Sequence, residues 1–440
     1  MSFRKKIMVI LLIGFLFRLF IIFCLPVRTF EASIKRYHFG AINMLEGRGY
    51  SHFNSPPYPP SFYKPPVYSI FLAIIYKIFG VNLNTVRIIQ ALLDTVGCLL
   101  LFFILRSYFK EKVAFIGLGL AAFCPITAVY ANLLNPESLT VFFMILSLWL
   151  LSKSNRSKNL WLFFAIGIST ILMGYCRLEF FSFVFIFGGY LVFTQIEKEK
   201  VLKKIAVYSL GVMVVMIPWI VRNYYMTGKF IPLSAGKAVG IHLFSGTLGD
   251  VVNDSASLIK YLDENPEIKY VYDKWYEMTL HRRSGIEDQV KYDKILFDMA
   301  VDVIREHPFK YALMRIKRMP RVWVNLHADE FAFINTKNLR LLHPDFPKII
   351  YYTKNEPKEV LILGTKYLLF AINIFYILAA LRGIWLVRRR LLTFGFIFLP
   401  LLYAQILYMF IAVDANYTVP YWPCIIFFSA IGLVPARLID

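Results

Sequence analysis

Residues Arg28–Pro66 read RTFEASIKRYHFGAINMLEGRGYSHFNSPPYPPSFYKPP and form a strongly polar stretch near the start of a chain that is otherwise rich in long apolar segments. The stretch follows the apolar run Ile7–Leu25 and carries the Glu31 carboxylate, several cations, eight tyrosine or phenylalanine rings and a proline-rich exit. An apolar run of this length is long enough to span a bilayer. The two segments together predict a first transmembrane helix followed by a polar loop on the outer membrane face.

The composition predicts a polytopic membrane protein. Of the 440 residues, 58% are hydrophobic and 18% are charged, whereas about 25% of the residues of a soluble domain are charged. No small-residue cleavage pattern follows Ile7–Leu25, so this run is expected to remain as a permanent helix. The five cysteines lie within or beside apolar runs without zinc-ligand spacing, which argues against a disulfide framework.

Ten apolar segments are expected to span the membrane. They are Ile7–Leu25, Val86–Tyr108, Val113–Ala131, Glu137–Leu151, Trp161–Gly174, Phe180–Phe193, Ile205–Val221, Leu361–Leu381, Leu391–Ala412 and Val419–Pro435. The short loops that this arrangement places inside are basic, so both termini are expected in the cytoplasm. Much of the net charge of +21 lies in these loops and is assigned to orientation, not to nucleic-acid binding. The shorter segment Val67–Gly80 holds Lys77 and is expected to be interfacial or re-entrant.

The chain is expected to divide into three regions. Residues 1–221 form a transmembrane module whose first external loop, 26–66, is its catalytic loop, residues 222–360 form an external domain, and residues 361–440 form the last transmembrane helices. Apolar side chains in Asp288–Ile304 have helical spacing, so the external domain is expected to be mostly helical. The predicted fold class is an all-α polytopic membrane protein.

The predicted topology restricts the chemistry. The inner loops are too short to fold a nucleotide-binding domain, and the sequence has neither a glycine-rich phosphate loop nor an Asp-x-Asp pair. Soluble nucleotide-activated donors are not expected on the outer face. An enzyme working on that face would receive a lipid-linked donor through the bilayer.

Several motifs, in order along the chain, resemble those of the polyprenol-phosphate-sugar-dependent glycosyltransferases of the GT-C fold. The motifs are Gly47-Arg48-Gly49-Tyr50, Lys64-Pro65-Pro66 with Tyr68, Pro136-Glu137-Ser138-Leu139, Pro218-Trp219-Ile220-Val221-Arg222-Asn223-Tyr224, and Tyr417 with Pro420 and Pro423. The branch that they resemble contains the protein O-mannosyltransferases and the lipid A aminoarabinose transferases, of the glycosyltransferase family 39 type. The resemblance implies a GT-C bundle and transfer of a sugar, with inversion, from a polyprenyl phosphate to an acceptor.

The sequence departs from the family pattern at two positions. Members usually carry an aspartate in the first external loop where this chain has Ser33, and the nearest carboxylate is Glu31. Members also carry an arginine before the last tyrosine motif, where this chain has Asn416 with Asp414 nearby. The catalytic base and one anion contact are therefore not carried over from the family.

Glu31 and Glu137 are the two candidate bases. Inverting transfer needs a group that takes the acceptor proton, and a positioned carboxylate does this. Each residue also has a structural interpretation, because Glu31 could pair with Arg28 or Lys35, and Glu137 begins a helix whose dipole favours a carboxylate. The sequence does not decide between the two.

Cations and aromatic rings complete the candidate site. Lys64 and Arg222 are the expected contacts of the donor phosphate, where negative charge develops, although both positions also suit interfacial anchors. Arg177 is a further candidate for substrate binding, or a partner of Glu179 in a tight turn. The rings expected to contact substrate are those of Tyr37, Tyr63 and Tyr417, whose alternative place is the aromatic belt at the membrane interface.

No cofactor is assigned, and no metal site is expected because the histidines have no paired spacing. A divalent cation that bridges a carboxylate and the phosphate is compatible with the residues. The expected partners are a polyprenyl-phosphate sugar, membrane lipid, and a glycan, lipid or protein acceptor, without nucleic acid.

Other functions stay open. A lipid or solute transporter or flippase would hold ionisable residues at mid-membrane and show repeat symmetry, but the main candidates within spans are Arg18 and Asp94 and no repeat is visible. An O-antigen-type ligase or polymerase also uses a polyprenyl-linked donor but lacks the first-loop and Pro-Trp-x-x-Arg-Asn landmarks. A non-catalytic GT-C-like scaffold is kept open by Ser33.

Overall fold

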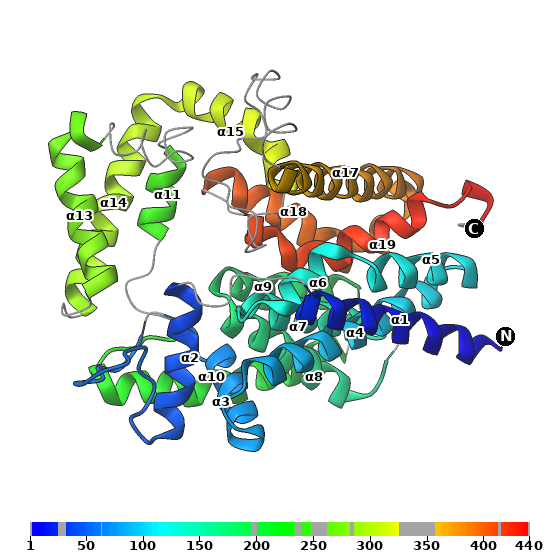
Figure 1. Cartoon of the computed structure of the whole chain (residues 1–440), viewed down its shortest axis with the longest axis horizontal. Helices are drawn as coiled ribbons and strands as arrows, with labels where there is room; N and C mark the ends of the chain where they lie inside the picture. Colours follow the sequence, from blue (N-terminus) through cyan, green and yellow to red (C-terminus); the bar gives the residue numbers. More distant parts are fainter. Residues whose placement is uncertain are drawn as a thin grey trace.

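The computed structural model describes residues 2–24, 32–62, 64–155, 157–194, 200–233, 239–247, 262–281, 286–324, 357–411 and 415–438, and within these ranges the chain forms helices and no strands. The helices build an elongated bundle with a further helical layer beside one end, and both chain termini lie at the other end (Figure 1). The predicted all-α fold is confirmed.

The first half of the chain supplies most of the bundle. Its helices are α1 (Phe3–Cys24), α4 (Leu83–Tyr108), α5 (Glu111–Ala122), α6 (Pro125–Asn132), α7 (Pro136–Ser152), α8 (Leu160–Cys176), the 3-10 helix η1 (Leu178–Ser182), α9 (Phe183–Thr194) and α10 (Val201–Thr227). Helices α2 (Ala32–Leu45) and α3 (Val67–Phe79) lie between α1 and α4 in the chain and pack on each other. Helix α4 is central, because it packs against α1, α5 and α7.

The second half forms the layer beside the bundle and then returns to it. The layer consists of α11 (Val239–Thr247), α13 (Pro266–His281), α14 (Ile286–Glu306) and α15 (Pro308–Trp323). Because it lies beside the bundle and not within it, we call it the external layer, a name that refers to the bundle and not to a side of the membrane. The returning elements are α17 (Pro357–Leu386), η6 (Arg388–Arg390), α18 (Gly395–Phe410), η7 (Ala415–Tyr421), α19 (Trp422–Gly432) and η8 (Ala436–Leu438). Helices α17 and α19 pack along each other, and α14 packs on α11. The division into three regions stays a prediction.

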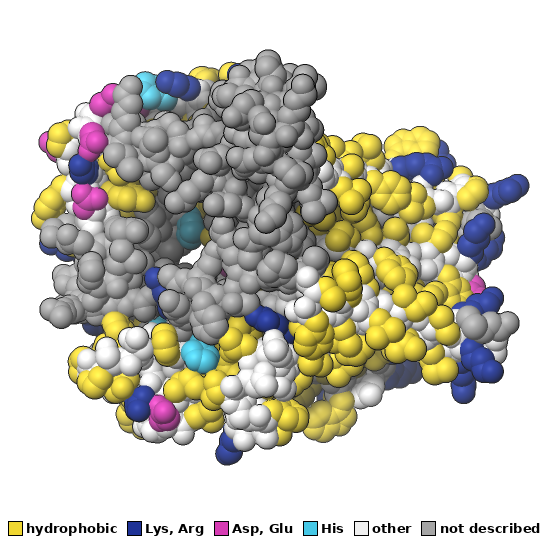
Figure 2. Space-filling view, viewed as in Figure 1, with side chains coloured by type: hydrophobic (Ala, Val, Ile, Leu, Met, Phe, Trp, Pro, Cys, Tyr) yellow, Lys and Arg dark blue, Asp and Glu magenta, His cyan; other side chains and the backbone are white. Residues whose placement is uncertain are grey.

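Four described helices are long and apolar enough to cross a bilayer: α1, α4, α10 and the Tyr367–Leu386 part of α17. Together, α5 and α6 pass the same test as a fifth span with a bend of 43°. The shorter apolar helices are α3, α7, α8, η1 with α9, and α18. On the face shown in Figure 2, apolar side chains cover much of the middle of the bundle, and Lys and Arg side chains gather at the end where the termini lie. The number of ten spans stays a prediction.

The predicted third span, Val113–Ala131, is two helices and not one, because the chain breaks before Pro125. Proline has no N–H, so Pro125 cannot donate to the carbonyl of Ala121, four residues earlier. The guanidinium of Arg18 on α1 donates instead to the carbonyls of Ala121 and Ala122, over 3.2 and 2.7 Å. Arg18 therefore caps the end of α5 from a neighbouring helix.

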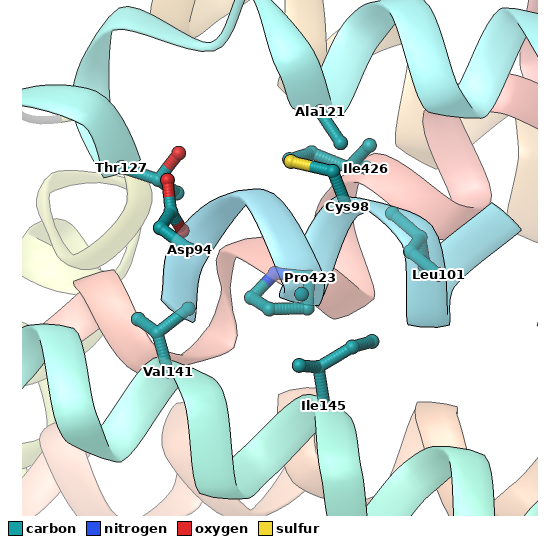
Figure 3. A pocket seen from close by; sticks show the side chains of 10 residues that line it. Asp94, Cys98, Leu101, Ala121, Thr127, Val141, Ile145, Pro423 and Ile426 are labelled. Atoms are coloured by element: carbon teal, nitrogen blue, oxygen red, sulfur yellow. The ribbon is translucent and has the colours of Figure 1, made fainter. Parts of the chain in front are cut away.

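Arg18 also forms an ion pair inside the bundle. Its Nη2 lies 2.6 Å from Oδ2 of Asp94 on α4, and the Arg18 side chain is only 1% exposed. Its Nη1 donates to the carbonyl of Gly14 over 2.9 Å. A small cavity lies beside the pair, with Asp94 and Thr127 on one side and Cys98 and apolar side chains around the rest (Figure 3). Since α1, α4 and α5 all contribute partners, the pair fastens three helices together.

Glycine allows two helices of the returning segment to touch. A Cβ atom added at Gly383 of α17 would overlap the carbonyl of Phe428, and one added at Gly432 of α19 would overlap the carbonyl of Ala379. Small residues at such crossings are typical of membrane helices, where close backbone approach replaces hydrophobic burial as the source of attraction. Segment η7, which directly precedes α19, packs against α7 of the bundle.

Candidate active site

The first loop is folded back by a glycine turn at the end of α2. Gly47 and Gly49 both have φ of +74°, a conformation that favours glycine, so the Gly-Arg-Gly motif is a requirement of the turn. Asn43 on α2 then donates to the carbonyls of Ser51 and Phe53, over 2.8 and 2.7 Å. Helix α2 and the segment that follows it are thereby joined into one unit.

Arg222, near the end of α10, holds this unit to the bundle. Its Nη1 donates to the Ser61 carbonyl over 2.9 Å and to Asn223 Oδ1 over 2.8 Å, and its Nη2 lies 3.4 Å from the Tyr50 carbonyl. The guanidinium carbon also lies 4.8 Å from the centre of the Trp219 ring. The Pro-Trp-x-x-Arg-Asn motif therefore anchors the first loop, and the contact of Arg222 with a donor phosphate stays a prediction.

Lys64 lies where the first loop returns to the bundle, with its Nζ 4.2 Å from the centre of the Tyr37 ring on α2. Burial raises the pKa of the Tyr37 hydroxyl well above its ordinary value; Tyr50 and Glu137 add to this rise, whereas Arg177 opposes it. The Tyr37 ring is buried in the same hydrophobic cluster as Leu139 and Cys176, which lie close in the chain to Glu137 and Arg177. It brings Lys64 to the same end of the bundle as these two charges.

Glu137, Arg177 and Asn416 come together from three distant parts of the chain, and we call them the carboxylate cluster. Arg177 Nη1 donates to Glu137 Oε1 over 2.8 Å and lies 3.3 Å from the Asn416 carbonyl. Asn416 Nδ2 donates to the same Glu137 oxygen over 3.0 Å. The three residues stand at the start of α7, the end of α8 and the start of η7. Glu137 is 3% exposed and Arg177 is 9% exposed, so both charges are buried, whereas Asn416 is partly exposed.

Arg177 is held between two carboxylates. Its Nη2 pairs with Glu179 Oε1 over 2.5 Å, in addition to the pair with Glu137. Burial by itself would lower the pKa of the Arg177 guanidinium, but Glu179 and Glu137 together raise it well above its ordinary value. The ring of Tyr417 lies 4.7 Å from the guanidinium carbon. Arg177 therefore keeps its positive charge despite its burial.

Two acceptor atoms of the carboxylate cluster have no hydrogen-bond partner among the described residues. They are Glu137 Oε2 and Asn416 Oδ1, and both are buried. Buried polar atoms are nearly always paired, and leaving one without a partner costs about 1–3 kcal/mol. Since both atoms are acceptors, they would be satisfied by a hydrogen-bond donor, such as a sugar hydroxyl or an amine, or by a cation.

Gln90 of α4 holds the turn that leads into Glu137. Its Nε2 donates to the carbonyls of Ala131 and Leu133, over 2.9 and 2.7 Å. Its Oε1 accepts a hydrogen bond from the Tyr68 hydroxyl of α3 over 2.7 Å. The start of α7 is thus tied both to the centre of the bundle and to the helix that follows the first loop.

The residues predicted from the sequence fall into three groups. Lys64, Tyr37, Glu137, Arg177 and Tyr417 lie at one end of the bundle. Arg222 contacts the first loop. Glu31 and Tyr63 lie outside the described residues, as does Asp414. Which of these residues act in a reaction stays a prediction.

Sequence reasoning did not assign a site role to Asn416 or Gln90. Asn416 had a usable signal, because it stands directly before Tyr417 where the family pattern has an arginine, and an asparagine also offers a donor. The sequence held no such signal for Gln90, because a glutamine within an apolar helix does not by itself indicate which backbone carbonyls it contacts.

In the described part of the chain, no group of three His, Cys, Asp or Glu side chains is placed to hold a metal ion. The carboxylates of Glu137 and Glu179, which could otherwise share a divalent cation, are bridged by the Arg177 guanidinium. The chain thus supplies the positive charge between them itself.

Parts of this chain are similar in sequence to known proteins. Residues 63–221 match the family described as dolichyl-phosphate-mannose-protein mannosyltransferase. Over 109 residues the chain is 35% identical to the Bacillus subtilis protein named "Putative mannosyltransferase YkcB", a match that covers 24% of this chain and 15% of that protein.

Solved structures show the same fold. The Archaeoglobus fulgidus oligosaccharyltransferase in complex with Zn and sulfate aligns with 96% of this chain and 48% of its own, at 12% identity and a TM-score of 0.53. The oligosaccharyltransferase AglB of the same organism, in complex with an inhibitory peptide and a dolichol-phosphate, aligns with 98% of this chain and 50% of its own, at 15% identity and a TM-score of 0.52.

The fold thus defines the class: the chain is a membrane protein of the GT-C fold. It spans about half the length of the archaeal oligosaccharyltransferase. Within this class, the match over residues 63–221 confirms the resemblance to polyprenol-phosphate-sugar-dependent glycosyltransferases of the mannosyltransferase type.

Proposed function

We propose that this chain is an inverting glycosyltransferase that moves a sugar from a polyprenyl-phosphate-linked donor to an acceptor at the outer membrane face. The observation that carries the proposal is the carboxylate cluster with its two buried acceptor atoms, which are unpaired among the described residues. The matched family is described by mannosyl transfer from dolichyl phosphate, and AglB was solved with a dolichol-phosphate, which supports a lipid-linked donor.

Glu137 is the base that the geometry favours. In a single displacement, the acceptor oxygen attacks the anomeric carbon, the bond from that carbon to the phosphate oxygen breaks, and the acceptor proton passes to a base. Arg177 and Asn416 hold Oε1 of Glu137, while Oε2 has no donor among the described residues. Oε2 is therefore suited to accept a hydrogen bond from the acceptor hydroxyl and then its proton. Glu31 is the alternative base.

Lys64 suits the departing phosphate. The contact of its ammonium with the Tyr37 ring fixes the side chain by a cation–π interaction and leaves the charge intact. A fixed cation stabilises the negative charge that develops on the polyprenyl phosphate as the glycosidic bond breaks. Arg177 suits this role less, because two carboxylates already neutralise it.

The orientation of the bundle supports action at the outer face. Lysine and arginine side chains gather at the end of the bundle that holds both termini (Figure 2). The positive-inside rule places such an end in the cytoplasm. The first loop and the external layer lie at the other end (Figure 1) and would then be outside.

The test is sugar transfer by the purified chain in liposomes that contain defined polyprenyl-phosphate sugars. We expect the wild type to transfer sugar, Glu137→Gln to lose transfer while still binding donor, and Lys64→Ala to bind donor more weakly. Glu46→Gln is the matched control, because Glu46 is exposed and pairs with Arg48 away from the cluster.

Two outcomes would change the proposal. Loss of sugar transfer in Glu31→Gln, with transfer kept in Glu137→Gln, would identify Glu31 as the base. A wild type that binds polyprenyl phosphate but transfers no sugar would contradict the proposal and favour a carrier or scaffold.

A further inference from the structure

Two side chains of α15, one helical turn apart, contact the end of α18. The Tyr311 hydroxyl donates to the Phe410 carbonyl over 2.9 Å. Arg315 donates through its Nε and Nη2 to the carbonyls of Tyr408, Met409 and Ile411. Four consecutive carbonyls of the bundle are therefore bound by one helix of the external layer.

These carbonyls need donors from outside their own helix. Helix α18 ends at Phe410, and the last carbonyls of a helix have no intrahelical N–H partner. The negative end of the helix dipole also favours a cation. Arg315 is only 5% exposed, so its charge is placed in a buried position that these acceptors match. Tyr311 and Arg315 thus act together as a cap supplied by another part of the chain, and we call them the α18 cap.

The capped turn leads directly to the carboxylate cluster. The Tyr408 hydroxyl donates to the Tyr417 carbonyl over 3.0 Å, and the two rings lie 5.9 Å apart. Tyr417 in turn places its ring on Arg177, and its neighbour Asn416 donates to Glu137. The end of α18 and the start of η7 are therefore fixed to each other beside the site.

Helix α11 of the external layer meets the same segment. Arg315 Nη1 lies 3.4 Å from the Gly246 carbonyl of α11, and the His242 ring lies edge-on to the Tyr417 ring at 6.2 Å. Two helices of the external layer thus converge on the residues that hold the cluster. The contacts run from α11 and α15 through the end of α18 to Glu137.

We propose that Tyr311 and Arg315 are positioning residues, through which the external layer holds Asn416 and Tyr417 against Glu137 and Arg177. As a statement about catalysis, this inference rests on the proposed glycosyltransferase function. Without the cap, the last turn of α18 would lose its external donors, and the Asn416 amide would no longer be held in place to orient the Glu137 carboxylate. The external layer then controls the alignment of the site from outside the bundle.

The first experiment measures kcat and KM for the lipid-linked donor in Arg315→Gln, Arg315→Lys and Tyr311→Phe. We expect Arg315→Gln to lower kcat by about tenfold or more, since small misplacements of catalytic groups cost up to about 10²-fold. The KM for donor should stay within about twofold, because Lys64 and the first loop are not part of the cap. Arg315→Lys should recover part of kcat. Lys317→Gln, which removes an exposed charge from the same helix, should change neither constant.

A double-mutant cycle separates positioning from a general loss of structure. Arg315→Gln should lower kcat by a smaller factor in an Asn416→Ala background than in the wild type, because both changes act on the same contact with Glu137. Independent, fully additive losses would overturn the inference. So would a kcat within twofold of the wild type in folded Arg315→Gln protein.

Hydrogen–deuterium exchange tests the cap without reference to activity. Amides in residues 405–421 should exchange faster in Arg315→Gln than in the wild type or in Lys317→Gln, while α4 should be unchanged. Unchanged exchange in residues 405–421 would overturn the inference. Faster exchange in Arg315→Gln, combined with a wild type that transfers no sugar, would support the cap and contradict the proposed function alone.

Discussion

Among the described residues, two buried arginines, Arg18 and Arg177, pair with carboxylates, and the surroundings of these pairs differ. Around Arg18, the Asp94 carboxylate and the carbonyls of Gly14, Ala121 and Ala122 use the guanidinium donors. Around Arg177, two carboxylates share one guanidinium, and acceptor atoms of Glu137 and Asn416 have no partner among the described residues. No atom of Arg18 or Asp94 is among the buried atoms without a partner in the described residues, and we call this the saturated pair. The second pair leaves room for a donor from a ligand. Burial of a charge pair alone therefore does not mark a functional site, and the balance of donors and acceptors does.

The two pairs also differ in what holds them. Arg18 and Asp94 project from the middle of α1 and α4, two long helices of the bundle. Glu137, Arg177 and Asn416 stand at helix ends, where turns and caps set their positions. A residue at a helix end can move without displacing a whole helix, which suits a group that must meet a substrate.

The largest expected effect is on the rate of sugar transfer, which should fall when the Arg177–Glu137 pair is changed and not when the Arg18–Asp94 pair is changed. Glu137→Gln removes a proton acceptor and should lower the rate of sugar transfer by about 10²–10⁴-fold. Asp94→Asn should leave the rate per folded molecule within a few-fold, because Asp94 pairs with Arg18, which holds helices of the bundle together. Initial rates in liposomes, normalised to folded protein, measure both. A greater loss of rate in Asp94→Asn than in Glu137→Gln would reverse the comparison.

The saturated pair should matter more for stability. Arg18→Leu leaves the Asp94 carboxylate buried without its partner and should lower the free energy of unfolding by about 3–5 kcal/mol. Replacing both residues by leucine should recover part of this loss. Denaturation midpoints of the detergent-solubilised variants provide the measurement. Equal stability of the single variant and the wild type would show that the pair holds no helices together.

Substitutions of Asn416 test whether the carboxylate cluster needs the hydrogen bond that the neutral Asn416 amide donates to Glu137. A hydrogen bond to a charged group contributes about 1.5–3 kcal/mol, so Asn416→Leu should slow transfer by about 10–100-fold. Asn416→Arg, which places at this position the residue of the family pattern, should keep more activity than Asn416→Leu. Rates from the same liposome assay decide this point. Equal rates in Asn416→Leu and the wild type would remove Asn416 from the site.

The smallest effect concerns the helix crossing behind η7. Gly383→Ala forces a methyl group towards the Phe428 carbonyl and should lower the free energy of unfolding by about 1–3 kcal/mol. Gly364→Ala is the matched control on the same helix, since an added Cβ there meets nothing within 4 Å. Denaturation midpoints again give the result. A destabilisation of equal size at both positions would argue against close packing at the crossing.

Much of the helix order could be predicted from the sequence, because the length of an apolar run is a local property. The predicted spans Ile7–Leu25 and Val86–Tyr108 correspond to α1 (Phe3–Cys24) and α4 (Leu83–Tyr108). The break in Val113–Ala131 was missed although Pro125 stood in the sequence, because proline inside an apolar run does not itself show whether the helix stops or bends.

The site was only partly predictable. Glu137 and Arg177 were both candidates, yet their pairing joins residues 40 positions apart, and the Asn416 contact with Glu137 joins residues 279 positions apart. Such contacts follow from how helix ends meet in space, which no local pattern encodes. The family pattern drew attention to position 416, but only because an arginine was missing there. The structure shows that Asn416, with a shorter side chain than arginine, donates a hydrogen bond to Glu137.

The contacts of Arg18 also have a consequence for biosynthesis. Arg18 precedes its partners Asp94, Ala121 and Ala122 in the chain by at least 76 residues, so helix α1 is synthesised before them. An arginine at the centre of a lone membrane helix costs about 2.5–3.5 kcal/mol on insertion scales. Helix α1 should therefore enter the lipid more readily in company with α4 and α5 than alone, so that these helices leave the translocon as a group.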